Sequence, residues 1–215
     1  MKQLVSLFYL FIAVNSFSQK NFDGLIKAEK SFAAYSVAYG TKDAFLKFAD
    51  STGIIFDPAT ESPVNAIEIW NKREKRPGKL DWQPEYAEIA ASNDFGYTTG
   101  PYTFTMNDTV TARGEYVTVW QMNKQGEWKF LLDLGVNNTP KILALSLEKT
   151  GEKKISGNSS IDELLKAEQG FIAYYKIDKQ NAYKKYLSEK SILKRNGYYS
   201  ATNKKLQKRI INFTI

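Results

Sequence analysis

The chain of 215 residues contains no cysteine and no histidine. Without thiols and imidazoles it can form no disulfide, thiolate nucleophile, Ser-His-Asp or Cys-His triad, and none of the usual zinc sites. Any chemistry must therefore use Asp, Glu, Lys, Tyr, Ser or Thr side chains. We expect no metal and no cofactor.

Long apolar runs are also scarce. Leu4–Val14 is too short to span a bilayer; it follows Met1-Lys2 and precedes the small residues Ser16 and Ser18. This pattern predicts a signal peptide over residues 1–18, cleaved before Gln19, and a periplasmic or secreted protein. An uncleaved membrane anchor is the alternative. No cysteine follows the run, which excludes a lipoprotein anchor, and after cleavage we expect no membrane association.

The composition is that of a globular protein, with 43% hydrophobic residues, 4 Trp, 13 Tyr and 13 Phe. Its charge is uneven. Residues 1–150 hold 16 basic and 17 acidic side chains, a net charge of −1, whereas residues 151–215 hold 14 and 6, a net charge of +8. The tyrosines of the basic part fall at helical core spacing, which indicates a solvated helix face. We therefore expect no nucleic-acid partner.

A long-period repeat divides the chain. Leu25–Tyr35 recurs as Leu164–Tyr174 with seven of eleven residues identical. A period near 139 residues corresponds to a whole domain rather than a solenoid unit. We predict a domain over residues 21–145, a polar Gly- and Ser-containing linker over 146–160, and a partial second copy over 161–215. The chain is then either a piece of a longer tandem protein or carries a degenerate second copy.

Hydrophobic periodicity predicts helices first and strands afterwards in the first copy, the order of an α+β fold. Three helices cover one face of a curved antiparallel sheet. The expected helices are Gly24–Tyr39, Lys42–Ala49 and Asn65–Lys75, and the expected strands are Gly53–Phe56, Leu80–Ala91, Phe95–Thr105, Thr111–Asn123 and Glu127–Leu134.

Four ordered phrases, Leu80–Pro84, Ser92–Tyr102, Gly114–Trp120 and Gly126–Gly135, resemble the SnoaL-like domains of the nuclear transport factor 2-like superfamily. The resemblance covers about residues 25–136. It implies a cone-shaped domain, with three helices in the concavity of the sheet, a pocket between them, and frequent dimerisation. Relatives in this superfamily include ketosteroid isomerases, polyketide cyclases, dehydratases and non-catalytic binding domains, so the fold alone does not assign an activity.

An isomerase or cyclase of this shape needs a carboxylate base in its pocket, and Asp50 and Asp133 are the weak candidates. Strand alternation places Asp133 on the face opposite Phe130, which favours a structural role that ties the strand end to a loop. Glu29 is interpreted as part of a surface or capping ion pair. No catalytic residue of the isomerases can be transferred, because their acid–base motifs have no clear match here.

We therefore favour an exported binding or scaffold domain that is not an enzyme; the alternative is an isomerase, cyclase or hydratase that uses carboxylate acid–base catalysis. Apolar residues on both sheet faces, such as Val117 and Trp120, predict a homodimer or packing against a second domain copy. The ligand is expected to be mostly apolar, with one or two oxygens, because the predicted lining has hydroxyl and indole donors but no cation. That lining consists of Tyr35, Phe45, Trp70, Tyr97, Tyr116 and Trp120.

Overall fold

The computed structural model describes residues 2–56, 62–138, 148–149, 160–188, 191–202 and 204–212. The chain separates into two compact units. The first comprises residues 1–135 and 140–153, and the second comprises residues 136–139 and 154–215. The first unit contains the helices and the sheet that the sequence predicts for residues 21–145. The predicted linker, 146–160, lies outside the described residues except at 148–149 and 160.

The first unit has three helices in its described residues: two precede the first strand, and the third lies between the second and third strands. They are α1 (Lys2–Tyr39), α2 (Thr41–Phe48) and α3 (Ala66–Lys72). Gly40 separates α1 from α2 with a φ of 96°, a conformation that glycine adopts without steric cost. Asn65 caps α3, because its side chain accepts a hydrogen bond from the Glu68 N–H at 3.0 Å.

The helix expected over Asn65–Lys75 is shorter in the structure. Arg73 has extended backbone angles, with φ −79° and ψ 141°, so α3 ends at Lys72. The residues after it form a loop that leads to the next strand. This early end is important for the candidate site, because the loop carries three of the cationic side chains described below.

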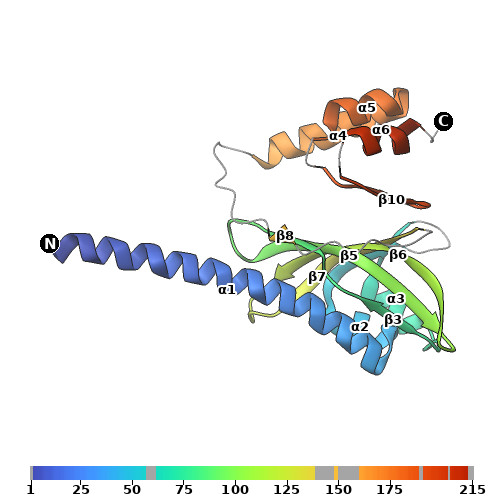
Figure 1. Ribbon diagram of the computed structural model, residues 1–215, viewed down its shortest axis with the longest axis horizontal. Helices are drawn as coiled ribbons and strands as arrows, with labels where there is room; N and C mark the ends of the chain where they lie inside the picture. The colour runs from blue at the N-terminus through green and yellow to red at the C-terminus, as the bar shows by residue number, and fades with distance from the viewer. Residues whose placement is uncertain are drawn as a thin grey trace. The chain divides into compact units, whose positions relative to one another are not determined.

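The sheet of the first unit is curved and open. Its strands run in the spatial order β2-β1-β7-β6-β5-β4-β8, with β3 also paired to β5 (Figure 1). β1 pairs antiparallel with β2, and β5 pairs antiparallel with β3, β4 and β6. β1 with β7 and β4 with β8 are parallel, so the sheet is mixed rather than wholly antiparallel as expected. The strands are β1 (Ala49–Phe56), β2 (Pro63–Asn65), β3 (Lys79–Trp82), β4 (Tyr86–Ile89), β5 (Phe95–Met106), β6 (Thr109–Met122), β7 (Trp128–Asn137) and β8 (Glu148–Lys149).

The strand predicted over Leu80–Ala91 is broken into β3 and β4. Proline has no N–H to donate to a ladder, and Pro84 lies at the break. Strand β5 continues past it: the Gln83 N–H donates to Pro101 O at 3.4 Å and the Glu85 N–H donates to Thr99 O at 2.9 Å. Two short strands therefore pair with one long strand.

Gly100 is required where β5 passes this break. A Cβ atom at position 100 would lie 2.0 Å from the Gln83 carbonyl oxygen and 3.0 Å from the Glu85 nitrogen, both of them backbone atoms. We expect Gly100→Ala to lower the free energy of unfolding by about 2 to 4 kcal/mol, because the two segments must move apart. Urea unfolding followed by tryptophan fluorescence measures this loss.

Gly135→Ala is the matched control for this prediction. Its added Cβ would meet only the edge of the Tyr102 ring, at 3.2 Å, and a side chain can move by a few tenths of an ångström. The control is expected to lose less than about 1 kcal/mol. Equal losses in the two variants would show that the close approach at Gly100 is not what fixes the break.

An aromatic core joins the helices to the concave face of the sheet. The Phe32 ring of α1 is fully buried, and its centroid lies 5.0 Å from that of Phe45, 4.7 Å from that of Trp82 and 5.5 Å from that of Phe130. Buried aromatic pairs of this kind stabilise a fold beyond the area that they remove from water. The expected α+β architecture, with three helices covering a curved sheet, is confirmed for the first unit.

The second unit contains α4 (Ile161–Ile177), α5 (Lys179–Tyr186), β9 (Leu193–Arg195), β10 (Tyr198–Ala201) and α6 (Lys204–Asn212). Ser160 and Glu163 form a reciprocal capping box at the start of α4. Leu164 is 63% exposed, whereas its counterpart in the repeat, Leu25, is fully buried against the sheet of the first unit. Among the described residues, the sheet of this unit is only the β9–β10 pair, and the partial second domain copy over 161–215 stays a prediction.

The predicted signal peptide falls in the first half of α1. No helix in the described part of the chain is both long enough and apolar enough to cross a bilayer. Export and cleavage before Gln19 stay predictions from the sequence.

Candidate functional site

Two carboxyl groups lie on the concave side of the sheet in the first unit, and they form the buried acid centre. Glu29 projects from the middle of α1 and is completely buried. Trp82 Nε1 donates to Glu29 Oε1 at 2.5 Å, and Trp120 Nε1 donates to Glu29 Oε2 at 2.8 Å. The Thr98 hydroxyl also donates to Oε2. The helix is thus tied to β3, β5 and β6 through one side chain.

The interpretation of Glu29 as a surface or capping ion pair is wrong. Glu29 forms no ion pair with any described residue, and its partners are two indole N–H groups and a hydroxyl. Burial raises the pKa of Glu29, while the hydrogen bonds from Thr98, Trp82 and Trp120 oppose that rise. Glu168, the equivalent residue of the repeat, is exposed on α4.

Asp133 of β7 is the second member of the centre, and it is half-buried. Its Oδ2 accepts a hydrogen bond from the Thr118 hydroxyl at 2.7 Å, and Thr118 is itself fully buried. Burial raises the pKa of Asp133 to about 7, and the nearby charge of Glu29 adds to the rise, whereas the Thr118 hydrogen bond lowers it. A carboxyl group with this pKa exchanges its proton near neutral pH.

The expectation that Asp133 faces away from the aromatic side is wrong. Thr118 lies two residues from the buried Tyr116 and two from the buried Trp120 along β6. Residues two apart in a strand share a face, so the Thr118 side chain is on the concave side. Phe130 is also buried there, yet it is three residues from Asp133, an odd number. Strict alternation of side chains must therefore be interrupted between Phe130 and Asp133, which the sequence does not reveal.

Tyr116 borders the two acids. Its hydroxyl is buried and has no hydrogen-bond partner among the described residues, and its pKa is raised by burial and by the charges of Glu29 and Asp133. A carboxyl group does lie inside the concavity, but the Tyr116 hydroxyl makes no hydrogen bond to it in the described part of the chain. No group of three or more acidic side chains comes together as a metal site in the described ranges.

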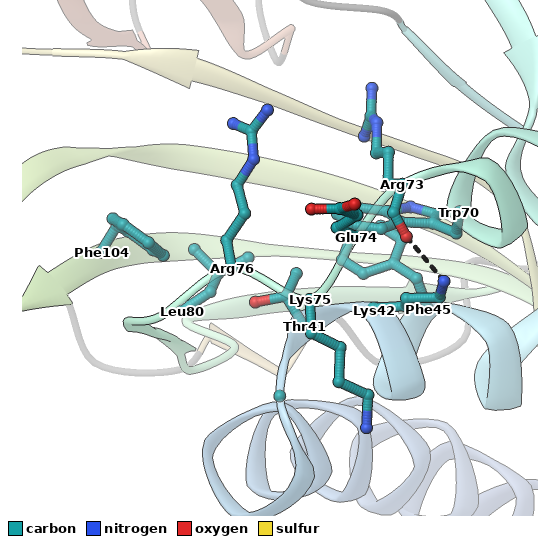
Figure 2. A pocket seen from close by; sticks show the side chains of 11 residues that line it. Thr41, Lys42, Phe45, Trp70, Arg73, Glu74, Lys75, Arg76, Leu80 and Phe104 are labelled. Carbon is teal, nitrogen blue, oxygen red and sulfur yellow. Dashed lines mark hydrogen bonds between the residues drawn. The ribbon is translucent and has the colours of Figure 1, made fainter.

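A separate pocket of about 550 Å³ opens beside the helices, and it is called the α2–α3 pocket here (Figure 2). Its apolar walls are Phe45 of α2, Trp70 of α3, Leu80 of β3 and Phe104 of β5. The Phe45 and Trp70 ring centroids are 4.8 Å apart. Its other lining residues are Gly40, Thr41, Lys42, Arg73, Glu74, Lys75 and Arg76.

Trp70 contributes an unused donor to this wall. Its Nε1 atom is buried, and no acceptor among the described residues bonds to it. Buried indole N–H groups normally find a partner, because an unsatisfied donor costs about 1 to 3 kcal/mol. The other face of the pocket is polar: the Lys42 ammonium donates to Arg73 O at 2.6 Å and to Asn71 O at 3.2 Å.

The structure divides the predicted ligand-binding residues among four places. Phe45 and Trp70 line the α2–α3 pocket, whereas Tyr116 and Trp120 belong to the buried acid centre. The Tyr35 ring packs against that of Tyr39, with the centroids 4.3 Å apart, and Lys47 Nζ lies 4.0 Å from its centroid. These residues do not form the single cavity that the sequence suggests.

Tyr97 lies on the opposite face of β5 from Thr98. Its hydroxyl donates to Glu88 Oε2 at 3.2 Å, the same oxygen that accepts from the Tyr86 hydroxyl. Residues adjacent in a strand point to opposite faces, and Thr98 points to Glu29. The placement of Tyr97 in the lining is therefore corrected.

Asp50, the other candidate base, is in a turn-like part of β1. Its Oδ1 accepts from the Thr52 N–H at 2.9 Å and from the Thr52 hydroxyl at 2.8 Å. These hydrogen bonds lower the pKa of Asp50. A carboxylate stabilised in this way is a weak base, and Asp50 does not line the α2–α3 pocket described above.

Sequence reasoning missed the burial of Glu29 and the loop cation Arg76, whereas Arg73 could be named from the sequence as able to bind an acidic ligand, but without a partner. The recurrence of Glu29 within the Lys-Ala-Glu phrase of both repeats was a signal, but its counterpart Glu168 shows that the phrase alone does not determine burial. Arg73 and Arg76 follow a helix end, where cations are also expected for reasons of helix stability.

No protein-family model and no curated protein matches the sequence. Solved structures do match. An NTF2-like protein with a cystatin-like fold from Novosphingobium aromaticivorans is 8% identical, covers 63% of this chain and 88% of its own, and has a TM-score of 0.44. The Δ5-3-ketosteroid isomerase from Mycobacterium sp. is 14% identical, covers 51% of this chain and 90% of its own, and has a TM-score of 0.39.

A ketosteroid isomerase-like protein from Erwinia carotovora atroseptica is 12% identical, covers 54% of this chain and 95% of its own, and has a TM-score of 0.40. Identities this low transfer no residue role. These three structures are similar to part of this chain in fold alone.

Proposed function

We propose that this protein binds a small, flat, mostly apolar molecule in the α2–α3 pocket. The observation that carries the proposal is the aromatic wall of this pocket, one member of which, Trp70, has a buried N–H without an acceptor in the described structure. A rotation of the indole would bring this N–H, which has no exposed surface, to a ligand carbonyl or ether oxygen. A volume of about 550 Å³ is within the range of small-molecule sites.

The walls suit a planar ligand. Phe45, Trp70, Leu80 and Phe104 offer apolar surface from two helices and two strands, so the site rests on regular elements rather than on a loop alone. Three of these four side chains are aromatic, and aromatic walls favour ligands whose rings stack or pack edge-on. The predicted class of ligand, apolar with one or two oxygens, is retained, but its site differs from the predicted cavity.

Binding of methyl 2-naphthoate tests the proposal, because this probe is planar and carries an ester carbonyl. We expect saturable binding in calorimetry, weakened about fivefold in Trp70→Phe, since the change removes one hydrogen bond and keeps an aromatic ring. The stability of Trp70→Phe without the probe should equal or exceed that of the wild type, because a buried donor without an acceptor is removed.

Tyr97→Phe is the matched control. It also changes an aromatic side chain, but on the other face of the sheet, and it should leave binding unchanged. Weaker binding in Tyr97→Phe with full binding in Trp70→Phe would show that the probe binds outside the α2–α3 pocket. No binding to the wild type would contradict the proposal.

Acid–base catalysis is a second candidate function, favoured by the position of Asp133 beside Glu29 on the concave side of the sheet, where burial raises its pKa to about 7. A general base works best when its pKa is near the operating pH. Against this role, Asp133 Oδ2 already accepts a hydrogen bond from the Thr118 hydroxyl at 2.7 Å, and the oxygens of the neighbouring Glu29 are occupied by donors from Trp82, Trp120 and Thr98. A rate profile that inflects near pH 7 with a Δ5-3-ketosteroid, and is abolished in Asp133→Asn, would support it.

We also propose that the protein is exported and that it associates with a second copy or domain. The sequence of residues 1–18 supports export, and exposed apolar residues on α4, including Ile161 at 77% and Leu164 at 63%, support burial against a second copy or domain.

A further inference from the structure

The rim of the α2–α3 pocket is strongly basic. Four of its lining residues are cationic, Lys42, Arg73, Lys75 and Arg76, and one is acidic, Glu74. A cleft lined by charges of one sign concentrates ligands of the opposite sign. The sequence-based expectation of a lining without cations is therefore corrected for this pocket.

Two of these cations are already engaged within the protein. Lys42 bonds to the Asn71 and Arg73 carbonyls at the end of α3, and Lys75 forms an ion pair with Asp43 at 2.5 Å. They hold the loop after α3 against α2. The ammonium groups of Lys42 and Lys75 therefore mainly stabilise the rim itself.

The two arginines are placed differently. The Arg73 guanidinium lies 4.6 Å from the Trp70 ring centroid, and Arg76 is exposed, with no ion pair to any described residue. Figure 2 shows both guanidinium groups extending to the same side of the pocket, while the Lys75 side chain extends to the other. A planar ligand beside Trp70 would therefore present its edge to a cationic rim.

The start of α2 adds to this positive potential. Gly40 and Thr41 line the pocket, and the Gly40 N-cap provides no side-chain acceptor for the first N–H groups of the helix. The N-terminal end of a helix carries a partial positive charge. The donor at Trp70, the guanidinium of Arg76 and this helix end all favour oxygen acceptors, and two of the three favour negative charge.

We infer that the ligand of the α2–α3 pocket is a planar carboxylic acid, bound with its ring system against Phe45, Trp70 and Phe104 and its carboxylate at Arg76. The inference rests on the proposed function and specifies its ligand class. A guanidinium matches a carboxylate with two parallel hydrogen bonds, which a neutral oxygen cannot accept.

The test compares 2-naphthoate with methyl 2-naphthoate, two probes that share a ring system and a carbonyl and differ in charge. We expect calorimetry on the full chain to show about tenfold tighter binding of the acid, a preference that shrinks when NaCl is raised from about 25 mM to about 300 mM. Arg76→Gln should remove the preference and leave the affinity for the ester unchanged.

Lys72→Gln is the matched control, because Lys72 is exposed on α3 and does not line the pocket. It should change neither affinity. Equal affinities for acid and ester, or a preference that persists in Arg76→Gln, would overturn the inference and leave the proposed function standing. No binding of either probe would overturn both. Circular dichroism of each variant checks that it is folded.

Discussion

Replacing Glu29 with alanine is expected to lower the free energy of unfolding by about 3 to 5 kcal/mol. The carboxylate accepts hydrogen bonds from Trp82, Trp120 and Thr98, and all of these partners lie in the interior. Its loss leaves the Trp82 indole N–H without an acceptor and opens a cavity between α1 and the sheet. Urea unfolding followed by tryptophan fluorescence measures the effect directly.

Two variants sharpen this experiment. Glu29→Gln keeps the volume and one acceptor oxygen, so its loss should be smaller, about 1 to 2 kcal/mol. Glu168→Ala changes the corresponding residue of the repeat, which is exposed, and should stay within about 0.5 kcal/mol of the wild type. A Glu29→Ala chain as stable as the Glu168→Ala chain would show that the hydrogen bonds to Glu29 do not hold the helix to the sheet.

The stability of the first unit is expected to fall as the pH rises from about 4 to about 7. Burial raises the pKa of Asp133 from 3.8 to about 7, so the folded state keeps this proton over a range in which the unfolded chain has lost it. Stability decreases with pH wherever the folded state binds more protons, and above about pH 7 this contribution is constant. The raised pKa of Glu29 acts in the same direction.

The Asp133 contribution amounts to as much as about 4 kcal/mol, at 1.36 kcal/mol per pKa unit. Asp133→Asn removes the titration and can still accept the Thr118 hydrogen bond through its amide oxygen. The variant should match the wild type near pH 4 and exceed its stability at pH 8. Asp50, whose pKa is lowered, acts oppositely at low pH, but it is present in both chains and cancels in the comparison.

Urea unfolding at four or five pH values between 4 and 8 would measure both curves. Parallel curves for the wild type and Asp133→Asn would contradict the prediction, because they would mean that Asp133 titrates as it does in the unfolded chain.

Local chemistry in the sequence determined much of the first unit. The Asn107-Asp108 pair predicts the turn between β5 and β6, and both residues have positive φ, 50° and 58°, as a tight hairpin requires. Gly126, with φ 80°, ends the next turn in the same way. Apolar spacing predicted the C-terminal end of α1 and both ends of α2 to within one residue, because Gly40 interrupts the helical pattern, but α1 begins at Lys2 rather than at the predicted Gly24.

The strand break at Pro84 was not predicted from the sequence, which indicated one strand over Leu80–Ala91. Only the pairing of both β3 and β4 with β5 shows that one long strand spans this break. Pairing partners are set by contacts between distant segments, and period-two patterns describe a single strand.

The interior of the concavity was decided by tertiary structure alone. Glu29 meets Trp120 across 91 positions of sequence, and no local pattern distinguishes it from the exposed Glu168 in the same phrase. Asp133 reaches Thr118 because the alternation of β7 is interrupted, and Arg76 joins the pocket because α3 ends early. The sequence by itself determined which segments are helix, strand and turn, since these depend on neighbouring residues. Only the packing of the helices onto the sheet decided which charged side chains are buried, since burial depends on what the rest of the chain places over them.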